Sequence, residues 1–175
     1  MSHIKEKEAL NEEIIEPGFV LKTLFRSFNK TNIKEDKYIV MLYGIYNIKT
    51  KTFNYSSAGF NMSPFIIKNS GKIHDMNVKG FPICKLGNLV SPYYENRTLK
   101  LETSDKILFY SDGLVDAKDK NGERHGIDRL KDFLKTRHNL NSEELNTAIN
   151  ERFFKHIGEE GELIDDVTFL TMMVH

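Results

Sequence analysis

Two acidic segments of the sequence could take part in metal chemistry. The first is Ser111-Asp112-Gly113, which directly follows an apolar run at 105–110. An Asp at the end of a buried strand, beside a Gly that permits close approach, is typical of oxygen sites for hard cations. The same Asp-Gly pair is common in the turn of a β-hairpin, so the motif alone leaves both interpretations open.

The second acidic segment is Asp165-Asp166-Val167-Thr168, at the start of the apolar run that closes the chain. Adjacent carboxylates repel each other, and burying them costs free energy unless a cation or hydrogen-bond donors compensate. The alternative is a solvated acidic loop that leads into a strand. If the strands beside Asp112 and Asp165 are neighbours, a divalent ion bound there could activate water as a nucleophile near neutral pH.

Other reactive side chains lack the spacing that common sites require. The six His show no His-x-x-x-His pair, which argues against zinc, and we expect most of them at the surface. Cys84 is the only cysteine, so we expect a small apolar side chain and no intrachain disulfide. The sequence contains neither a P-loop nor a Gly-x-Ser-x-Gly elbow, which disfavours nucleotide hydrolysis by a P-loop and serine-hydrolase chemistry.

The elements that must position the acidic segments are predicted by hydrophobic periodicity. Helical spacing predicts helices over about 18–30, 127–134 and 142–157, the last with Ser142 as its N-cap. Runs of β-branched and aromatic residues predict strands at 38–46, 52–56, 64–68, 72–77, 93–101, 107–110 and 167–174. Helices packed on antiparallel sheets make an α+β fold.

The composition predicts one soluble, cytoplasmic domain over residues 1–175. This length is usual for a single domain. The 25 Lys and Arg balance the 25 Asp and Glu, which removes the electrostatic basis for binding nucleic acid or an acidic membrane surface. No apolar run approaches the roughly 20 residues of a membrane span, and the first residues lack the apolar core of a signal peptide.

Short motifs in a fixed order along the chain resemble one known family. They are Gly80-Phe81-Pro82-Ile83, the run 105–113, Asn121-Gly122-Glu123, and Asp165-Asp166-Val167-Thr168. Together they resemble the PPM-type metal-dependent serine/threonine protein phosphatases, in the branch typified by stage II sporulation protein E and the bacterial sigma-factor regulatory phosphatases. The similarity extends from about Val20 to His175.

The resemblance implies a fold, a metal centre and a reaction. The implied fold is an α-β-β-α sandwich of antiparallel sheets that holds a pair of Mn²⁺ or Mg²⁺ ions at one end. The implied metal ligands are Asp112 and Asp165, and the implied positioning residues are Ser111, Gly113, Asp166 and Thr168. The implied reaction is attack of metal-activated water on a phosphoserine or phosphothreonine of an anti-sigma-factor antagonist.

The sequence departs from this family at one point that bears on activity. The family's earlier Gly-Asp motif, whose Asp bridges both metals, has no counterpart, so we expect a domain truncated at its N-terminus. Two cations would repel each other across a site with too few carboxylates, so we expect weak activity or none. A second copy of the chain, in a homodimer, could supply the missing element across an exposed sheet edge.

Two alternatives stay open from the sequence. One is a non-catalytic binding or switch module that keeps the phosphatase fold. The other is an unrelated antiparallel domain with acidic turns, in which the strand ends beside Asp112 and Asp165 would lie far apart.

Overall fold

The computed structural model describes residues 16–87 and 91–175; residues 1–15 and 88–90 of the predicted single domain lie outside the described residues. The helices are α1 (Pro17–Asn29), α2 (Gly113–Asp116), α3 (Ile127–Thr136) and α4 (Ser142–Ile157). The strands are β1 (Tyr38–Ile39), β2 (Met41–Asn47), β3 (Thr52–Ala58), β4 (Phe65–Ile67), β5 (Ile73–Asp75), β6 (Ile83–Cys84), β7 (Arg97–Lys100), β8 (Lys106–Tyr110) and β9 (Phe169–Met173).

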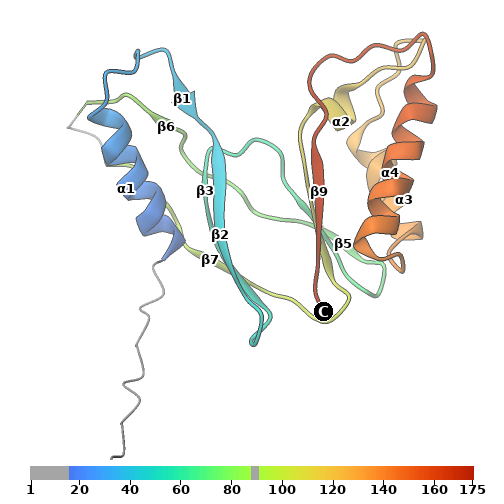
Figure 1. The fold of residues 1–175 in the computed structure, drawn as a ribbon, viewed down its shortest axis with the longest axis horizontal. Helices are drawn as coiled ribbons and strands as arrows, with labels where there is room; N and C mark the ends of the chain where they lie inside the picture. Colours follow the sequence, from blue (N-terminus) through green and yellow to red (C-terminus); the bar gives the residue numbers. More distant parts are fainter. Residues whose placement is uncertain (1–15, 88–90) are drawn as a thin grey trace, which may run out of the picture.

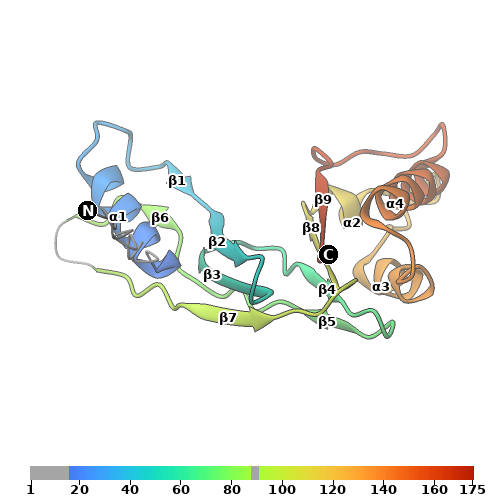
Figure 2. The ribbon, with the colours of Figure 1, turned by 60° about the horizontal axis from the view of Figure 1, so that its bottom comes forward.

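These elements stack in the order helix, sheet, sheet, helix pair (Figure 1). One sheet has the strand order β2-β3-β7 and the other the order β5-β4-β8-β9, with all pairs antiparallel. A short β1–β6 pair lies beside α1. Figure 2 shows α3 and α4 side by side on the four-stranded sheet, far from α1.

The pairing of β8 with β9 decides where the two acidic segments lie. In this pair Tyr110, the last residue of β8, lies opposite Phe169, the first residue of β9. Because the strands are antiparallel, the segments 111–113 and 165–168 leave the sheet at the same end. The two strand ends are therefore neighbours.

Three hydrophobic clusters hold the layers together. One packs the four-stranded sheet against α3 and α4, a second lies between the two sheets, and a third packs α1 on the three-stranded sheet. Ile107 belongs to the cluster between the sheets and Leu108 to the cluster under α3 and α4. These neighbours face opposite sides because side chains alternate along a strand. Strand β8 is thus buried on both faces.

The predicted helices match α1, α3 and α4 to within two residues, but some details of the prediction were wrong. The N-cap of α4 is Asn141 and not Ser142. The Asn141 side chain accepts the Glu144 N–H, and the Glu144 carboxylate accepts the Asn141 N–H, each at 2.9 Å. The run 93–101 forms a strand only at 97–100, and β6 and α2 were not predicted. No helix of the described residues is long and apolar enough to cross a membrane.

Candidate metal site

The two acidic segments form the candidate site at one end of the four-stranded sheet. Asp112 is the N-cap of α2, and its Oδ1 accepts the N–H of Gly113 at 3.0 Å. Asp165 lies in the loop before β9, and its Oδ1 accepts the N–H of Asp166 at 2.7 Å. Since Gly113 begins a helix, the interpretation of Asp112-Gly113 as a hairpin turn is wrong.

Ser111 joins the two segments through three hydrogen bonds. Its backbone N–H donates to the carbonyl oxygen of Thr168 at 2.8 Å. Its hydroxyl donates to the carbonyl oxygen of Asp166 at 3.0 Å and accepts the N–H of Thr168 at 2.9 Å. A hydroxyl suits this position because it can donate and accept at once. Ser111 therefore fixes the backbone at 166–168 beside the end of β8.

Gly113 lets the backbone of the second segment pass close to α2. A Cβ at this position would lie 2.5 Å from the carbonyl oxygen of Asp166 and 2.9 Å from that of Asp165. Both distances are too short for a carbon and an oxygen in van der Waals contact. Any other residue would displace the 165–166 backbone, so the absence of a side chain at Gly113 is what allows the two segments to pack.

A mainly apolar cavity of about 250 Å³ opens beside Asp112. Phe60 and Asn61, which follow β3, form one wall, and Phe109 of β8 and Leu170 of β9 form part of the other. The loop after β3 and the strands β8 and β9 therefore line the cavity. The carboxylate of Asp112 thus lies at the edge of a mainly apolar cavity.

The described residues supply few ligands for a metal. In residues 16–87 and 91–175, no group of three or more His, Cys, Asp or Glu side chains could hold a metal ion. Asp112 and Asp165 are two carboxylates on packed neighbouring segments, and Mg²⁺ is often held by one or two carboxylates together with water. Within the described residues, Asp112 and Asp165 alone are too few for a pair of ions.

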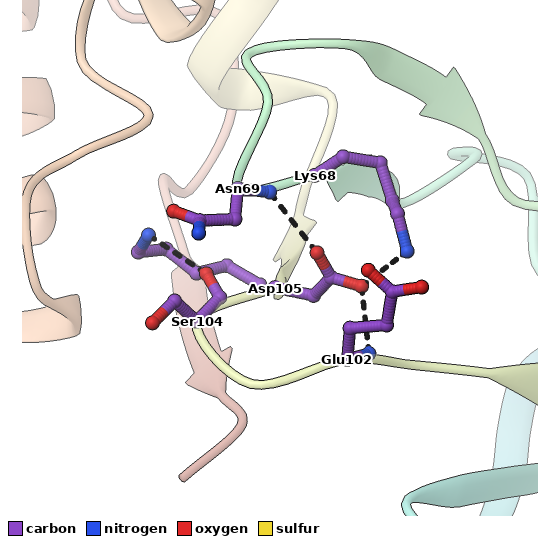
Figure 3. Close-up of polar contacts among 6 residues, drawn as sticks. Lys68, Asn69, Glu102, Ser104 and Asp105 are labelled. Carbon is purple, nitrogen blue, oxygen red and sulfur yellow. Dashed lines mark hydrogen bonds and ion pairs between the residues drawn. The ribbon is translucent and has the colours of Figure 1, made fainter.

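A buried carboxylate anchors the other end of β8 (Figure 3). Asp105 is fully buried and forms an ion pair with Lys68. Its carboxylate also accepts the Glu102 N–H at 2.8 Å and the Asn69 N–H at 3.0 Å. Burial acts to raise the pKa of Asp105, but the bonds from Lys68, Glu102 and Asn69 outweigh it and hold that pKa below its usual value. The strand that leads to Asp112 therefore starts from a fixed point.

Comparison with known proteins identifies the family of this chain. The family model for stage II sporulation protein E (SpoIIE) matches residues 4–175. The chain belongs to the SpoIIE family. Phosphoserine phosphatase RsbU of Bacillus subtilis (strain 168) is 32% identical over 133 residues, which are 74% of this chain and 38% of RsbU. The chain therefore spans less than half the length of this relative.

Solved structures of other proteins share the fold of this chain. The SiaA-PP2C domain of Pseudomonas aeruginosa matches with a TM-score of 0.74 at 16% identity, over 90% of this chain and 61% of that one. The Mn-presoaked phosphatase domain of SpoIIE from Bacillus subtilis matches with a TM-score of 0.59 at 17% identity, over 99% of this chain and 75% of that one. These matches confirm the predicted α+β sandwich of antiparallel sheets, and the family model confirms the predicted family.

The six residues predicted for the site of this SpoIIE-family chain all lie on the two segments that meet beyond β8 and β9. Sequence reasoning missed His125, which is 1% exposed although we expected most His at the surface. The only signal in the sequence is its place directly before Gly126, inside a segment that resembles the family. Its contacts lead back to α2, as shown below.

Proposed function

We propose that this chain acts as a metal-dependent phosphoserine or phosphothreonine protein phosphatase domain, with Mn²⁺ or Mg²⁺ at Asp112 and Asp165. The observation that supports this most is the β8–β9 pairing, which brings the two acidic segments to one end of the sheet. Membership of the SpoIIE family and the similarity to a phosphoserine phosphatase support the same proposal.

In this proposal the chain's own residues prepare the site before an ion binds. Asp112 and Asp165 would hold the ion from two separate segments, while Ser111 and Gly113 keep those segments in register through the contacts described above. A bound ion would supply Lewis-acid chemistry, since it activates water and neutralises phosphate charge. The cavity beside Asp112 would offer a mainly apolar surface next to the ion.

The proposed substrate is a phosphorylated protein, and by the family resemblance we propose an anti-sigma-factor antagonist in bacterial partner-switching signalling. The similarity to RsbU covers 38% of that protein. The substrate is therefore proposed for the matched region and is not taken over from the whole of RsbU. The chain is neutral overall, which favours recognition by local contacts over long-range attraction to a charged partner.

We propose weak turnover for this chain alone, because a pair of ions needs more carboxylates than Asp112 and Asp165 provide. A second copy could contribute the missing ligand by pairing with a sheet edge. Within the described residues β2 and β9 are edge strands, each hydrogen-bonded to one neighbour. The alternative function, a non-catalytic binding module, is favoured by the lack of a three-ligand group in the part of the chain that the structure describes.

Two measurements on the full chain test the proposal. Calorimetric titration with Mn²⁺ should show micromolar binding, and hydrolysis of p-nitrophenyl phosphate should depend on Mn²⁺. Asp112→Asn should abolish both. Asp132→Asn, which changes an exposed carboxylate paired with Lys135, should change neither. No Mn²⁺ binding to the wild type would favour the binding module, and full activity in Asp112→Asn would contradict the role of Asp112.

A further inference from the structure

His125 is a buried imidazole outside the acidic segments, and its contacts lead to the helix that follows Asp112. Its Nδ1 lies 2.9 Å from the carbonyl oxygen of Leu114 in α2. Its backbone N–H donates to the carbonyl oxygen of Ala117, and the N–H of Gly126 donates to that of Val115, each at 2.8 Å. Residues 125–126 thus form hydrogen bonds with three carbonyl oxygens, two in α2 and one directly after it.

These carbonyls need partners because α2 has a single turn. The last carbonyls of any helix have no donor within the helix itself. The nearest helical donor for the Leu114 carbonyl would be the N–H of Lys118, but that group donates to the carbonyl oxygen of Glu162 at 3.1 Å. The imidazole of His125 bonds the Leu114 carbonyl in place of the Lys118 N–H. At the other end of α2, the N–H groups of Val115 and Asp116 both donate to the carbonyl oxygen of Asp112 at 2.9 Å.

The segment 117–126, which ends with His125 and Gly126, also contacts the loop that carries Asp165. The N–H of Glu162 donates to the carbonyl oxygen of Lys118 at 3.0 Å, in return for the bond from Lys118. Lys118 in turn pairs with Arg124 in an antiparallel bridge, next to His125. One short segment, 117–126, therefore links α2 to the loop before Asp165.

The surroundings of His125 fix which nitrogen carries the proton. Leu114 offers an acceptor to Nδ1, whereas Nε2 is buried and has no hydrogen-bond partner among the described residues. The rings of Phe153 and His156 lie 5.9 Å and 5.2 Å away, between ring centroids. Burial, together with the nearby charges of His156, Arg152 and Arg129, lowers the pKa of His125 to about 4 against the opposing effect of the Leu114 bond. At neutral pH the ring is a neutral donor at Nδ1.

We propose that His125 is a positioning residue: its Nδ1–H bond to Leu114 holds α2, and with it Asp112, in register with the loop of Asp165. The effect on metal binding rests on the proposed function, whereas the effect on α2 does not. The argument depends on one donor atom, so it can be tested by removing that atom alone.

The matched variants are His125→Asn and His125→Leu. Asn places an N–H donor near the position of Nδ1, whereas Leu has the same branched shape without a donor. Both lose the ring contacts to Phe153 and His156. Because one hydrogen bond separates them, amide hydrogen exchange at Val115 and Asp116 should be about tenfold faster in His125→Leu than in His125→Asn. Exchange in β8 should be the same in both, and Mn²⁺ affinity should be about tenfold weaker in His125→Leu.

The outcomes separate this proposal from the proposed function. Equal exchange at Val115 and Asp116 in the two variants would overturn the positioning role. A difference in exchange, with no Mn²⁺ bound by wild type, would support positioning and refute the metal site. If neither variant folds, nitrogen chemical shifts of the wild-type imidazole decide: a proton on Nδ1 that persists from pH 5 to 8 supports the proposal, and a proton on Nε2 overturns it.

Discussion

Asp105→Asn should lower stability through the loss of one buried charge. The change preserves the shape of the side chain, but it replaces one acceptor oxygen with an NH₂ donor. The carboxylate of Asp105 accepts from Lys68 and Glu102 on one oxygen and from the Asn69 N–H on the other. In either orientation of the new amide, its NH₂ group would therefore face at least one donor.

The structure sets the size of this loss. A hydrogen bond to a charged group contributes roughly 1.5–3 kcal/mol, and an unsatisfied buried donor costs roughly 1–3 kcal/mol. The better orientation keeps the amide oxygen on Lys68 and Glu102 and gives up the bond from Asn69. The Lys68 side chain is 25% exposed, so water compensates part of its lost ion pair. We expect the free energy of unfolding to fall by about 2–4 kcal/mol at pH 7.

The pH dependence of the loss follows from the lowered pKa of Asp105. A carboxylate whose pKa is lower in the folded state stabilises the fold fully above its unfolded pKa, near 3.8, and loses that effect as the pH falls through the folded pKa. The difference between wild type and Asp105→Asn should therefore be constant from about pH 5 to 7. It should begin to shrink below about pH 3.8, where Asp105 of the unfolded state becomes protonated, and should be lost as the pH falls through the lower pKa of the folded state.

Urea unfolding measures both the loss of stability in Asp105→Asn and its dependence on pH, with Asp132→Asn as the matched control. Asp132 forms an exposed ion pair with Lys135 on α3, so its loss should change the free energy of unfolding by about 0.5 kcal/mol or less. The dependence of that free energy on urea should be unchanged in both variants. A loss below about 1 kcal/mol in Asp105→Asn, or a loss that persists undiminished at pH 3, would refute the reasoning.

Two further predictions concern the contact between the acidic segments. Gly113→Ala puts a Cβ 2.5 Å from the carbonyl oxygen of Asp166. The 165–166 backbone should shift and Mn²⁺ affinity should fall at least about tenfold by calorimetry; unchanged affinity would contradict this. Ser111→Ala removes the hydroxyl that bonds Asp166 and Thr168, so urea unfolding should show a loss of about 1–2 kcal/mol. Ser111→Thr, which keeps the hydroxyl, should lose much less, and equal losses would contradict the prediction.

Elements with a strong hydrophobic period could be predicted from the sequence, whereas short elements could not. Helix α4 was predicted because Leu145, Ile149 and Phe153 recur every four residues, and all three are buried. Strand β6 has two residues, too few for a period, and it exists because it pairs with β1. Helix α2 begins at the Gly of an Asp-Gly pair that suits a turn equally well. The neighbouring 165–166 backbone, which is remote in sequence, packs directly on Gly113.

The residues of the candidate site stood out in the sequence, but their assembly could not be predicted. The strand ends at Asp112 and Asp165 each stood out as acidic, yet their proximity depends on bonds such as that between Ser111 and Thr168, which are 57 positions apart. His125 could not be selected because its role comes from burial and from the Leu114 carbonyl, and neither leaves a periodic pattern.

The way the acidic segments are held has a consequence for ion binding. The contacts between them use backbone groups and the neutral hydroxyl of Ser111, while the Asp112 and Asp165 side chains accept from the amide of the next residue. Neither carboxylate forms an ion pair within the described residues, unlike Asp116, which pairs with Arg124 at 2.9 Å. In the proposed site, a cation would therefore replace no salt bridge of the described residues. Because the fold already holds both segments in place, little reorganisation should oppose its binding.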